Sequence, residues 1–273
     1  MKNRIFFASA IFIITLCTVP GVLFCQNEGY EPELGQAGKD VIWYPTPKAL
    51  VDTMIEMAKL TPADYLVDLG SGDGRIVIAA AKRGIRAEGV EFNPDMVEYA
   101  KKIAVREGVA DKTDFVKADF YEYDFSKATV ITMFLLPDIN RKLRPKLLEL
   151  KPGTRIITNS FSMDDWPYDE MRTIEDESIT WNIAYLWIVP AKVEGTWQSE
   201  DGELKLNQNF QTVSGTLKKG LRYFDISEGK LEGDAFHFTC NGVNYKCKVD
   251  KNNMKGTAEQ NGKAKQWGAV KQL

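Results

Sequence analysis

The chain has 273 residues, enough for one large domain or for a medium and a small domain with separate hydrophobic cores. Its composition is that of an ordinary globular protein, and 35 basic and 38 acidic residues leave a formal net charge of -3 at pH 7. Because Lys and Arg are spread along the chain, no segment offers the concentrated positive charge of a nucleic-acid site, and such a partner is disfavoured.

Residues 1–25 have the layout of a secretory signal. Lys2 and Arg4 precede an almost uninterrupted apolar run from Ile5 to Cys25. If this run is cleaved it is an export signal; if it is kept, it is about long enough to cross a bilayer as one helix. A buried core helix is the remaining alternative. With the positive charges inside, we expect an exported or membrane-anchored protein of the cell envelope or periplasm. Residues 26–40, rich in Gly, Glu and Pro, are expected to be a linker.

Folded structure is expected from about residue 41. The corner WYPTP leads into KALVDTMIEMAKL, whose apolar residues recur at helical spacing. We expect Thr46 to cap this helix and Pro47 to be its first residue.

From residue 65 to about residue 190, strand and helix patterns alternate. Short β-rich apolar runs separated by amphipathic helices are typical of a parallel, doubly wound sheet with helices on both faces. The run MRTIEDESITWNIAYLWIVPA then predicts an antiparallel hairpin that closes one edge. The other expected elements are strand 65–69, helix 74–83, strand 86–91, helix 94–107, strands 113–118 and 128–136, helix 138–149 and strand 154–161.

After Pro190 the pattern changes to short alternating runs with turns. Glycines recur at intervals of about 20 residues, as in repeated strand-turn-strand units. We expect residues 191–273 to form a small antiparallel barrel or sandwich. It either binds a protein, glycan or envelope surface, or only packs on the first domain.

Cysteine and histidine are scarce outside the leader. Cys240 and Cys247 lie on either side of the turn signal Asn241-Gly242, so they are expected on facing strands. There they form either a disulfide or two half-buried thiols. The single histidine, His237, lies between two phenylalanines and is interpreted as a sheet residue. No spacing of ligands for a metal is present.

Acids and glycines follow successive strands of the predicted sheet. VDLGSGDG places Asp68 and three glycines after the first strand, while Glu91 and Asp119 end the next two. Ligands of an open parallel sheet bind outside the carboxyl ends of its strands, and an acid in the position of Glu91 accepts hydrogen bonds from both hydroxyls of a ribose. These side chains are therefore expected to converge on one nucleoside-containing ligand.

The spacing of the glycines decides which kind of nucleotide-binding loop this segment resembles. A nicotinamide-dinucleotide site requires G-x-G-x-x-G, but Arg75 stands in the place of its third glycine. A hydride-transferring enzyme is therefore the less favoured alternative.

The segments VDLGSGDGRI, GVEFNP and VKADF resemble the motifs of class I S-adenosylmethionine-dependent methyltransferases. The resemblance implies a Rossmann-like seven-strand sheet over residues 41–190, S-adenosyl-L-methionine as the cofactor and no metal. It places the methionine part at Asp68 and the glycine loop, the ribose at Glu91, and the adenine at Phe92 and Asp119. The implied cofactor-binding residues are Asp68, Gly70, Ser71, Gly72, Asp73, Gly74, Glu91, Phe92, Asp119 and Phe120.

A narrower resemblance is carried by YPTP, TMFLLPDINRKLRPKLLELKPGTRI and SFSMDDW. These segments are similar to the group of mitochondrial lysine methyltransferases that modify the c subunit of ATP synthase and the adenine nucleotide translocase. The resemblance implies methylation of protein lysine, with a membrane-embedded protein as a candidate partner and membrane attachment through an uncleaved leader. LLPD after the fourth strand differs from the Asn-Pro-Pro-Tyr of enzymes that methylate nucleobases or glutamine, which disfavours those acceptors.

The acceptor side has its own candidates. We expect Tyr44, Thr46, Pro137 and Trp166 to form an apolar, aromatic mouth that aligns the amine and excludes water, with Leu136, Asp164 and Asp165 beside them. Their alternative roles are a helix cap, a strand terminator and a surface loop. A second hypothesis is a non-catalytic envelope binding or scaffold module that keeps the fold, because S-adenosylmethionine is made in the cytoplasm and the leader predicts export.

Overall fold

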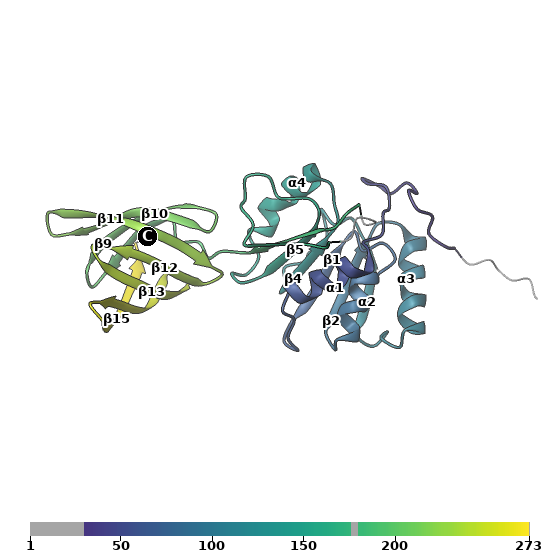
Figure 1. Cartoon of the computed structure of the whole chain (residues 1–273), viewed down its shortest axis with the longest axis horizontal. Helices are drawn as coiled ribbons and strands as arrows, with labels where there is room; N and C mark the ends of the chain where they lie inside the picture. The colour runs from purple at the N-terminus through teal and green to yellow at the C-terminus, as the bar shows by residue number, and fades with distance from the viewer. Residues whose placement is uncertain (1–29, 176–179, 273) are drawn as a thin grey trace, which may run out of the picture. The chain divides into compact units, whose positions relative to one another are not determined.

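The computed structural model describes residues 30–175 and 180–272, which form a helix-covered sheet followed by a barrel (Figure 1). The expected signal or anchor, residues 1–25, lies outside the described residues. In the part of the chain that is described, no helix combines the length and the apolar character needed to cross a membrane.

The first domain is built on one mixed sheet of seven strands in the order β3-β2-β1-β4-β5-β7-β6. All neighbours are parallel except β7, which runs antiparallel to both β5 and β6. The predicted Rossmann-like sheet with its edge hairpin is therefore confirmed. The strands are β1 (Tyr65–Leu69), β2 (Arg86–Glu91), β3 (Thr113–Lys117), β4 (Val130–Met133), β5 (Arg155–Asn159), β6 (Glu170–Thr173) and β7 (Ile183–Ile188).

Helices cover both faces of this sheet. One apolar cluster joins α1 (Lys48–Met57), α2 (Arg75–Lys82) and α3 (Pro94–Arg106) to one face. A second cluster joins α4 (Pro137–Leu147) and the loop after β3 to the other face. Central strands such as β1 and β4 are consequently buried on both sides, which is why they read as continuous apolar runs.

The start of α1 differs from the prediction. The helix begins at Lys48, Pro47 precedes it with an extended backbone, and no side chain caps it. Thr46 is only 4% exposed, and its hydroxyl accepts a hydrogen bond from Nδ2 of Asn159 (3.2 Å). A tertiary contact with the end of β5 therefore replaces the expected local cap.

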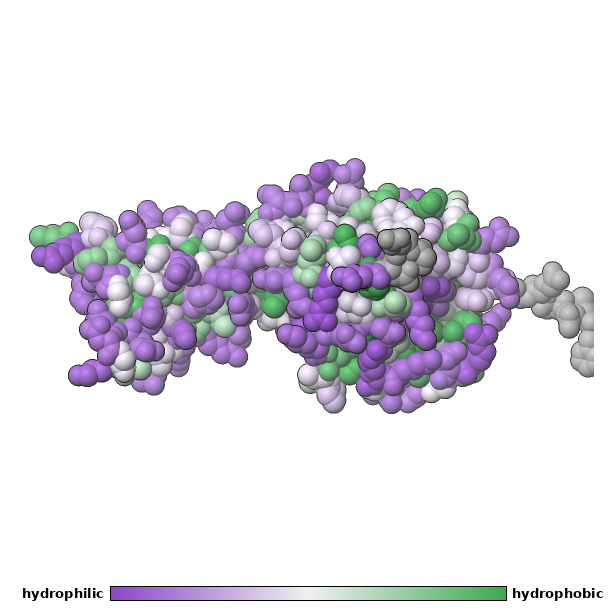
Figure 2. Space-filling model, in the orientation of Figure 1, coloured by the Kyte–Doolittle hydropathy of each residue, from purple (hydrophilic) through white to green (hydrophobic). Residues whose placement is uncertain are grey.

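The second domain is a closed barrel of eight antiparallel strands, with each strand paired to its neighbours in the chain and β15 paired back to β8. This confirms the barrel alternative. Apolar residues alternate inward, and the face of the barrel seen in Figure 2 is predominantly hydrophilic. The strands are β8 (Gly195–Ser199), β9 (Gly202–Asn209), β10 (Thr212–Lys219), β11 (Arg222–Glu232), β12 (Ala235–Cys240), β13 (Val243–Asp250), β14 (Asn253–Gln260) and β15 (Lys263–Lys271).

The two cysteines of the barrel are free, buried thiols, so the disulfide interpretation is wrong. The register pairs Cys240 with Val243 and Cys247 with Phe236, and the two sulfurs therefore do not face each other. His237 is paired with Lys246 inside β12, which agrees with its interpretation as a sheet residue.

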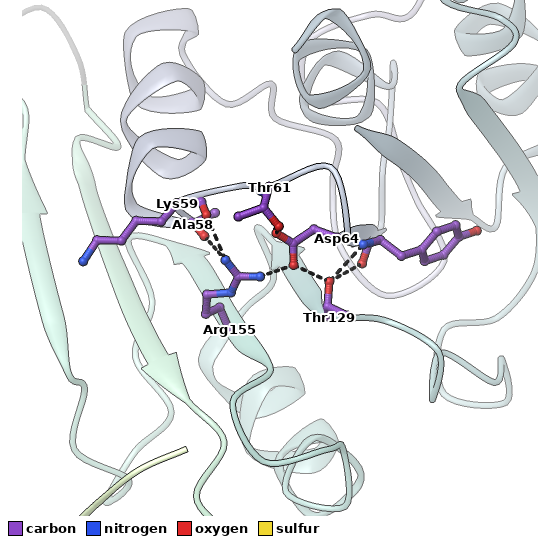
Figure 3. A network of polar contacts seen from close by, with 7 residues as sticks. Ala58, Lys59, Thr61, Asp64, Thr129 and Arg155 are labelled. Carbon is purple, nitrogen blue, oxygen red and sulfur yellow. Dashed lines mark hydrogen bonds and ion pairs between the residues drawn. The ribbon is translucent and has the colours of Figure 1, made fainter. Parts of the chain in front are cut away.

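A polar network joins the end of α1 to the amino ends of three strands (Figure 3). The carboxylate of Asp64 accepts hydrogen bonds from the backbone and hydroxyl of Thr61 (2.7 and 2.9 Å) and from the hydroxyl of Thr129 (2.7 Å), and it pairs with Arg155. Arg155 also donates to the carbonyl of Lys59 (3.1 Å). This network lies at the amino ends of β1, β4 and β5, away from the carboxyl edge, so we expect it to serve stability.

Asp64→Ala should lower the free energy of unfolding by about 2 to 4 kcal/mol, because it leaves the Arg155 guanidinium without its partner in a mostly buried place. Asp52→Ala, which breaks the exposed pair with Arg83, should cost less than about 1 kcal/mol. Urea unfolding of both variants measures the difference. A loss for Asp64→Ala as small as that of the control would contradict a structural role for the network.

Candidate active site

A cleft opens at the carboxyl edge of the sheet where its connections change direction. The helices that follow β1 and β4 pack on opposite faces, and the two strands are neighbours, with Asp68 in register with Thr132. The cleft has a volume of about 890 Å³ with its open mouth included, and it is lined by the loops after β1, β2, β3 and β4 and by residues 36–46. This is the ligand position expected for a doubly wound sheet.

The glycine loop after β1 has a left-handed backbone. Gly70, Gly72 and Gly74 have φ of 73°, 52° and 78°, a region that side chains with a Cβ rarely adopt. A Cβ on Gly72 would lie 2.6 Å from Nε1 of Trp43, and one on Gly74 would lie 2.6 Å from the ring of Phe115. Gly74 is the residue that caps the start of α2, and it does not line the cleft, so its predicted contact with the cofactor stays a prediction.

Ser71 and Asp73, the other predicted members of the loop, do line the cleft. The Ser71 hydroxyl is buried and has no hydrogen-bond partner among the described residues. The Asp73 carboxylate is held by Arg75, whose Nε donates to it (2.9 Å) and whose Nη1 donates to the Thr46 carbonyl (2.8 Å). Arg75 thus ties the loop to the segment before α1 through Asp73.

Glu91 at the end of β2 bridges two loops. One carboxylate oxygen accepts the backbone N–H of Gly72 and the other that of Asn93, both at 2.9 Å. A carboxylate offers about four acceptor sites, so two remain for hydroxyl donors. This places a pre-oriented acceptor beside the glycine loop, as a ribose diol requires.

Asp68 is the buried acid of the cleft, at 3% exposure. Burial raises the pKa of Asp68 to about 7, and the nearby carboxylates of Asp73 and Glu91 raise it further. The hydroxyl of Thr132 donates a hydrogen bond to the Asp68 carboxylate (2.7 Å), and this bond opposes the rise. A cationic group in the cleft would therefore find a carboxyl ready to ionise near neutral pH.

Lys39 lies among the residues predicted to hold adenine. Its ammonium pairs with Asp119 and is 5.2 Å from the ring centroid of Phe92 and 5.8 Å from that of Tyr121. The hydrogen bond from Lys39 lowers the pKa of Asp119, and the hydrogen bond from the backbone N–H of Tyr121 lowers it further. Burial of the carboxylate opposes this lowering. Phe120 is buried and lines the cleft behind them.

Lys39→Ala should tighten S-adenosylhomocysteine binding by about two- to fivefold, because an adenine amino group no longer competes with an exposed ion pair for Asp119. Lys101→Ala, on the exposed face of α3, is the matched control and should have no effect. Isothermal titration calorimetry measures both affinities. Weaker binding in Lys39→Ala would mean that the ammonium assists the ligand.

Residues 36–40, expected to be part of a linker, belong to the site. Ala37 bridges Ile42, and the backbones of Gln36 and Trp43 are hydrogen-bonded (2.9 Å). The turn they form lines the cleft. This turn is held in place by contacts with residues far along the chain, and the polar composition of the segment does not indicate them.

The acceptor-side predictions have mixed outcomes. Tyr44 and Thr46 line the cleft, but Pro137 does not and is instead the exposed first residue of α4. Trp166 is 1% exposed, and its Nε1 donates to Gln211 (3.1 Å). It is therefore a core residue, and its placement in the mouth is corrected.

The neighbouring candidates lie on the surface. Leu136 is 46% exposed just before α4. Asp164 and Asp165 pair with Arg141 and Arg144, which agrees with their alternative role as a surface loop.

An aromatic wall, of which the sequence predicted only Tyr44, adjoins the cleft. Trp181 lies 5.3 Å from Phe161, 5.9 Å from Phe134 and 6.4 Å from Tyr44, measured between ring centroids. Of these four rings, those of Tyr44 and Phe134 line the cleft. Its four rings come from four segments, so only the fold assembles it.

Comparison with known proteins shows which enzymes the chain is similar to. Residues 68–170 match the ANTKMT methyltransferase domain family. A protein-lysine N-methyltransferase of Saccharolobus islandicus is 41% identical over 152 residues, which are 55% of this chain and 94% of that protein. The human lysine N-methyltransferase of the ATP synthase c subunit is 37% identical over 128 residues, 46% of this chain and 54% of that protein, so this chain spans about half its length.

A solved methyltransferase structure is similar to the chain in fold and sequence. An RNA methyltransferase from Salinibacter ruber, in complex with S-adenosyl-L-homocysteine, is 47% identical with a TM-score of 0.51, covering 55% of this chain and 96% of that chain. The predicted cofactor, S-adenosylmethionine, is thereby supported by a structural neighbour and by the family. The chain belongs to the class I S-adenosylmethionine-dependent methyltransferases, and it is related to the lysine methyltransferases of the ATP synthase c subunit and of the adenine nucleotide translocase.

Proposed function

We propose that this enzyme methylates the ε-amino group of lysine in a protein. The observation that carries the proposal is a cofactor cleft that the glycine loop and Glu91 line together with Tyr44 and Phe134. These two rings belong to the aromatic wall that Phe161 and Trp181 complete. The names of the similar archaeal and animal enzymes support it, because they are lysine N-methyltransferases.

The residues present fit the cofactor. The glycine backbone, which has no Cβ atoms, and the acid of Asp68 suit the methionine part. The free lone pairs of Glu91 suit the ribose, and Phe92 with Asp119 suits the adenine. When bound, S-adenosylmethionine supplies a methyl group already activated by its sulfonium. The chain's own task is to align the amine and exclude water.

The aromatic wall suits a lysine acceptor in two ways. Ring faces attract an ammonium ion by cation–π interaction, which brings the charged side chain into the cleft. A poorly hydrated apolar surface also lowers the pKa of an amine, so the lysine loses the proton that would block its attack. Neither effect would select a phosphate-rich acceptor.

The acceptor and the place of action are further parts of the proposal. The animal relatives are named for ATP synthase and for the adenine nucleotide translocase. The apolar leader with Lys2 and Arg4 is the sequence feature that favours a membrane or envelope protein as the target. Attachment through an uncleaved leader would bring the cleft to such a target.

The test is transfer of labelled methyl groups from S-adenosylmethionine to membrane protein, soluble protein and RNA fractions, followed by mass spectrometry of the products. We expect label on lysine in the membrane protein fraction. Label on RNA alone would contradict the proposal and favour the activity for which the Salinibacter protein is named. No S-adenosylmethionine binding at all would favour the envelope scaffold.

Trp181→Ala should raise the KM for the acceptor by about tenfold, because the wall loses a ring whose cation–π attraction for the lysine ammonium contributes about 1 to 2 kcal/mol. The affinity for S-adenosylhomocysteine should stay unchanged. Tyr223→Ala, an exposed ring of the barrel, is the control. An equal loss of cofactor affinity in Trp181→Ala would mean that the wall only supports the fold.

A further inference from the structure

The loop from β3 to β4 begins with one tight turn that carries Asp119. The backbone carbonyl of Asp119 accepts hydrogen bonds from the N–H groups of Glu122 (3.0 Å) and Tyr123 (2.9 Å). Its carboxylate accepts the backbone N–H of Tyr121 (2.9 Å). The same turn therefore orients both the backbone and the side chain of Asp119, and a shift of the turn would move the carboxylate in the cleft.

A lysine of α4 holds this turn from outside the cleft. The ammonium of Lys146 donates to the carbonyl of Tyr121 (2.9 Å) and to that of Tyr123 (2.6 Å). It also lies 4.6 Å from the ring centroid of Phe125, within the range of a cation–π contact. Lys146 is half-buried and does not line the cleft, so any effect it has on a ligand passes through the turn.

A buried carboxylate of β2 holds the same loop at two further points. Glu88 is 1% exposed, and it accepts hydrogen bonds from the hydroxyls of Tyr65 and Tyr123. Lys127, farther along the loop, pairs with it at 2.8 Å. Buried ion pairs contribute little to stability compared with apolar residues of similar size. The geometry that this cluster imposes on the loop is therefore its more informative property.

We propose that Lys146 is a positioning residue for recognition of the cofactor's adenine, because it fixes the turn from which Asp119 reaches the amino group of that ring. Glu88 anchors the rest of the loop through Tyr123 and Lys127. The proposal rests on the predicted role of Asp119 toward adenine. It does not depend on which molecule accepts the methyl group.

Discrimination between adenine and hypoxanthine reports on this geometry. Adenine presents an amino donor at the ring carbon where hypoxanthine presents a carbonyl oxygen. A correctly placed carboxylate accepts a hydrogen bond from the first ring and repels the second. A displaced carboxylate loses both effects and binds the two rings alike. General damage to the site would instead weaken both ligands by the same factor and leave their ratio unchanged.

Calorimetric titration of the full chain with S-adenosylhomocysteine and with S-inosylhomocysteine, its hypoxanthine analogue, measures this preference. We expect wild type to prefer the adenine ligand by at least about 20-fold. Lys146→Met keeps the length of the side chain but has no donor, and it should lower the preference by about fivefold or more. Lys146→Arg still donates and should keep part of the preference. Lys102→Met, exposed on α3, is the matched control and should leave it unchanged.

A double variant shows whether Lys146 acts through Asp119. Asp119→Asn should lower the preference by itself, and adding Lys146→Met to it should lower the preference no further. An unchanged preference in Lys146→Met, or a second loss in the double variant, overturns the proposal. An unchanged preference in Asp119→Asn overturns the placement of adenine at Asp119, and the proposal with it. These titrations need no methyl acceptor, so their failure is distinguishable from a failure of the proposed lysine methylation.

Discussion

Glu91→Ala is expected to weaken S-adenosylhomocysteine binding by at least about 100-fold. Hydrogen bonds to a charged group contribute roughly 1.5 to 3 kcal/mol each, and two ribose hydroxyls would lose theirs together. The variant also releases the N–H groups of Gly72 and Asn93, which the carboxylate holds at 2.9 Å, so the two loops lose their link. No other acid in the described lining bridges the glycine loop to the loop after β2.

A graded series separates charge from shape. Glu91→Gln keeps the size of the side chain and one acceptor oxygen, so we expect a loss of about tenfold, between wild type and Glu91→Ala. Glu98→Ala, an exposed glutamate on α3, should bind as wild type does. Calorimetric titration gives all three affinities. A change below about threefold in both Glu91 variants would remove the ribose role of this carboxylate.

The central sheet can be predicted because its signals are local. The sequence predicts strands at 65–69 and 86–91, and β1 and β2 have those bounds, since apolar strands buried on both faces alternate with amphipathic helices. β4 is shorter than expected because Leu135 and Leu136 already turn toward Pro137, the first residue of α4.

The cofactor side of the cleft is also predictable, because acids and glycines at strand ends share one edge of a parallel sheet. The acceptor side is not. Trp181 and Phe161 stand next to each other only through the pairing of β5 with β7. Trp166 is packed in the core, and Gln211, 45 residues away, accepts its N–H. Long-range contacts of this kind leave no periodic pattern in the sequence.

Lys39 and Trp43 make the same point for residues 36–46. The polar, glycine-rich composition before residue 41 resembles a linker, yet Lys39 pairs with Asp119 eighty residues on and Trp43 packs against Gly72. Both contacts need the finished sheet. Segments with few local signals can therefore complete a site that strand-end motifs begin.

Asp68 makes the stability of the ligand-free protein depend on pH. Burial raises its pKa from 3.8 to about 7 in the folded protein, so the folded chain binds this proton more tightly than the unfolded chain. The resulting stabilisation is complete below pH 3.8 and is lost as the pH rises through about 7. Of this loss, about 2 to 3 kcal/mol falls between pH 5 and pH 8.

Asp68→Asn removes this dependence, because an amide keeps an acceptor for Thr132 without a charge at any pH. Relative to wild type, the variant should therefore gain about 2 to 3 kcal/mol of unfolding free energy between pH 5 and pH 8, whatever its stability at pH 5. Urea unfolding at both pH values measures it, with the exposed Asp111→Asn as a control that should show no gain. Since a cationic cofactor group beside Asp68 would favour its ionised form, cofactor binding near pH 6.5 should release a proton from wild type and not from Asp68→Asn. If the unfolding free energies of the two proteins change with pH in the same way, Asp68 is already ionised at pH 5 in the folded protein. Any proton released on cofactor binding would then have to come from another group.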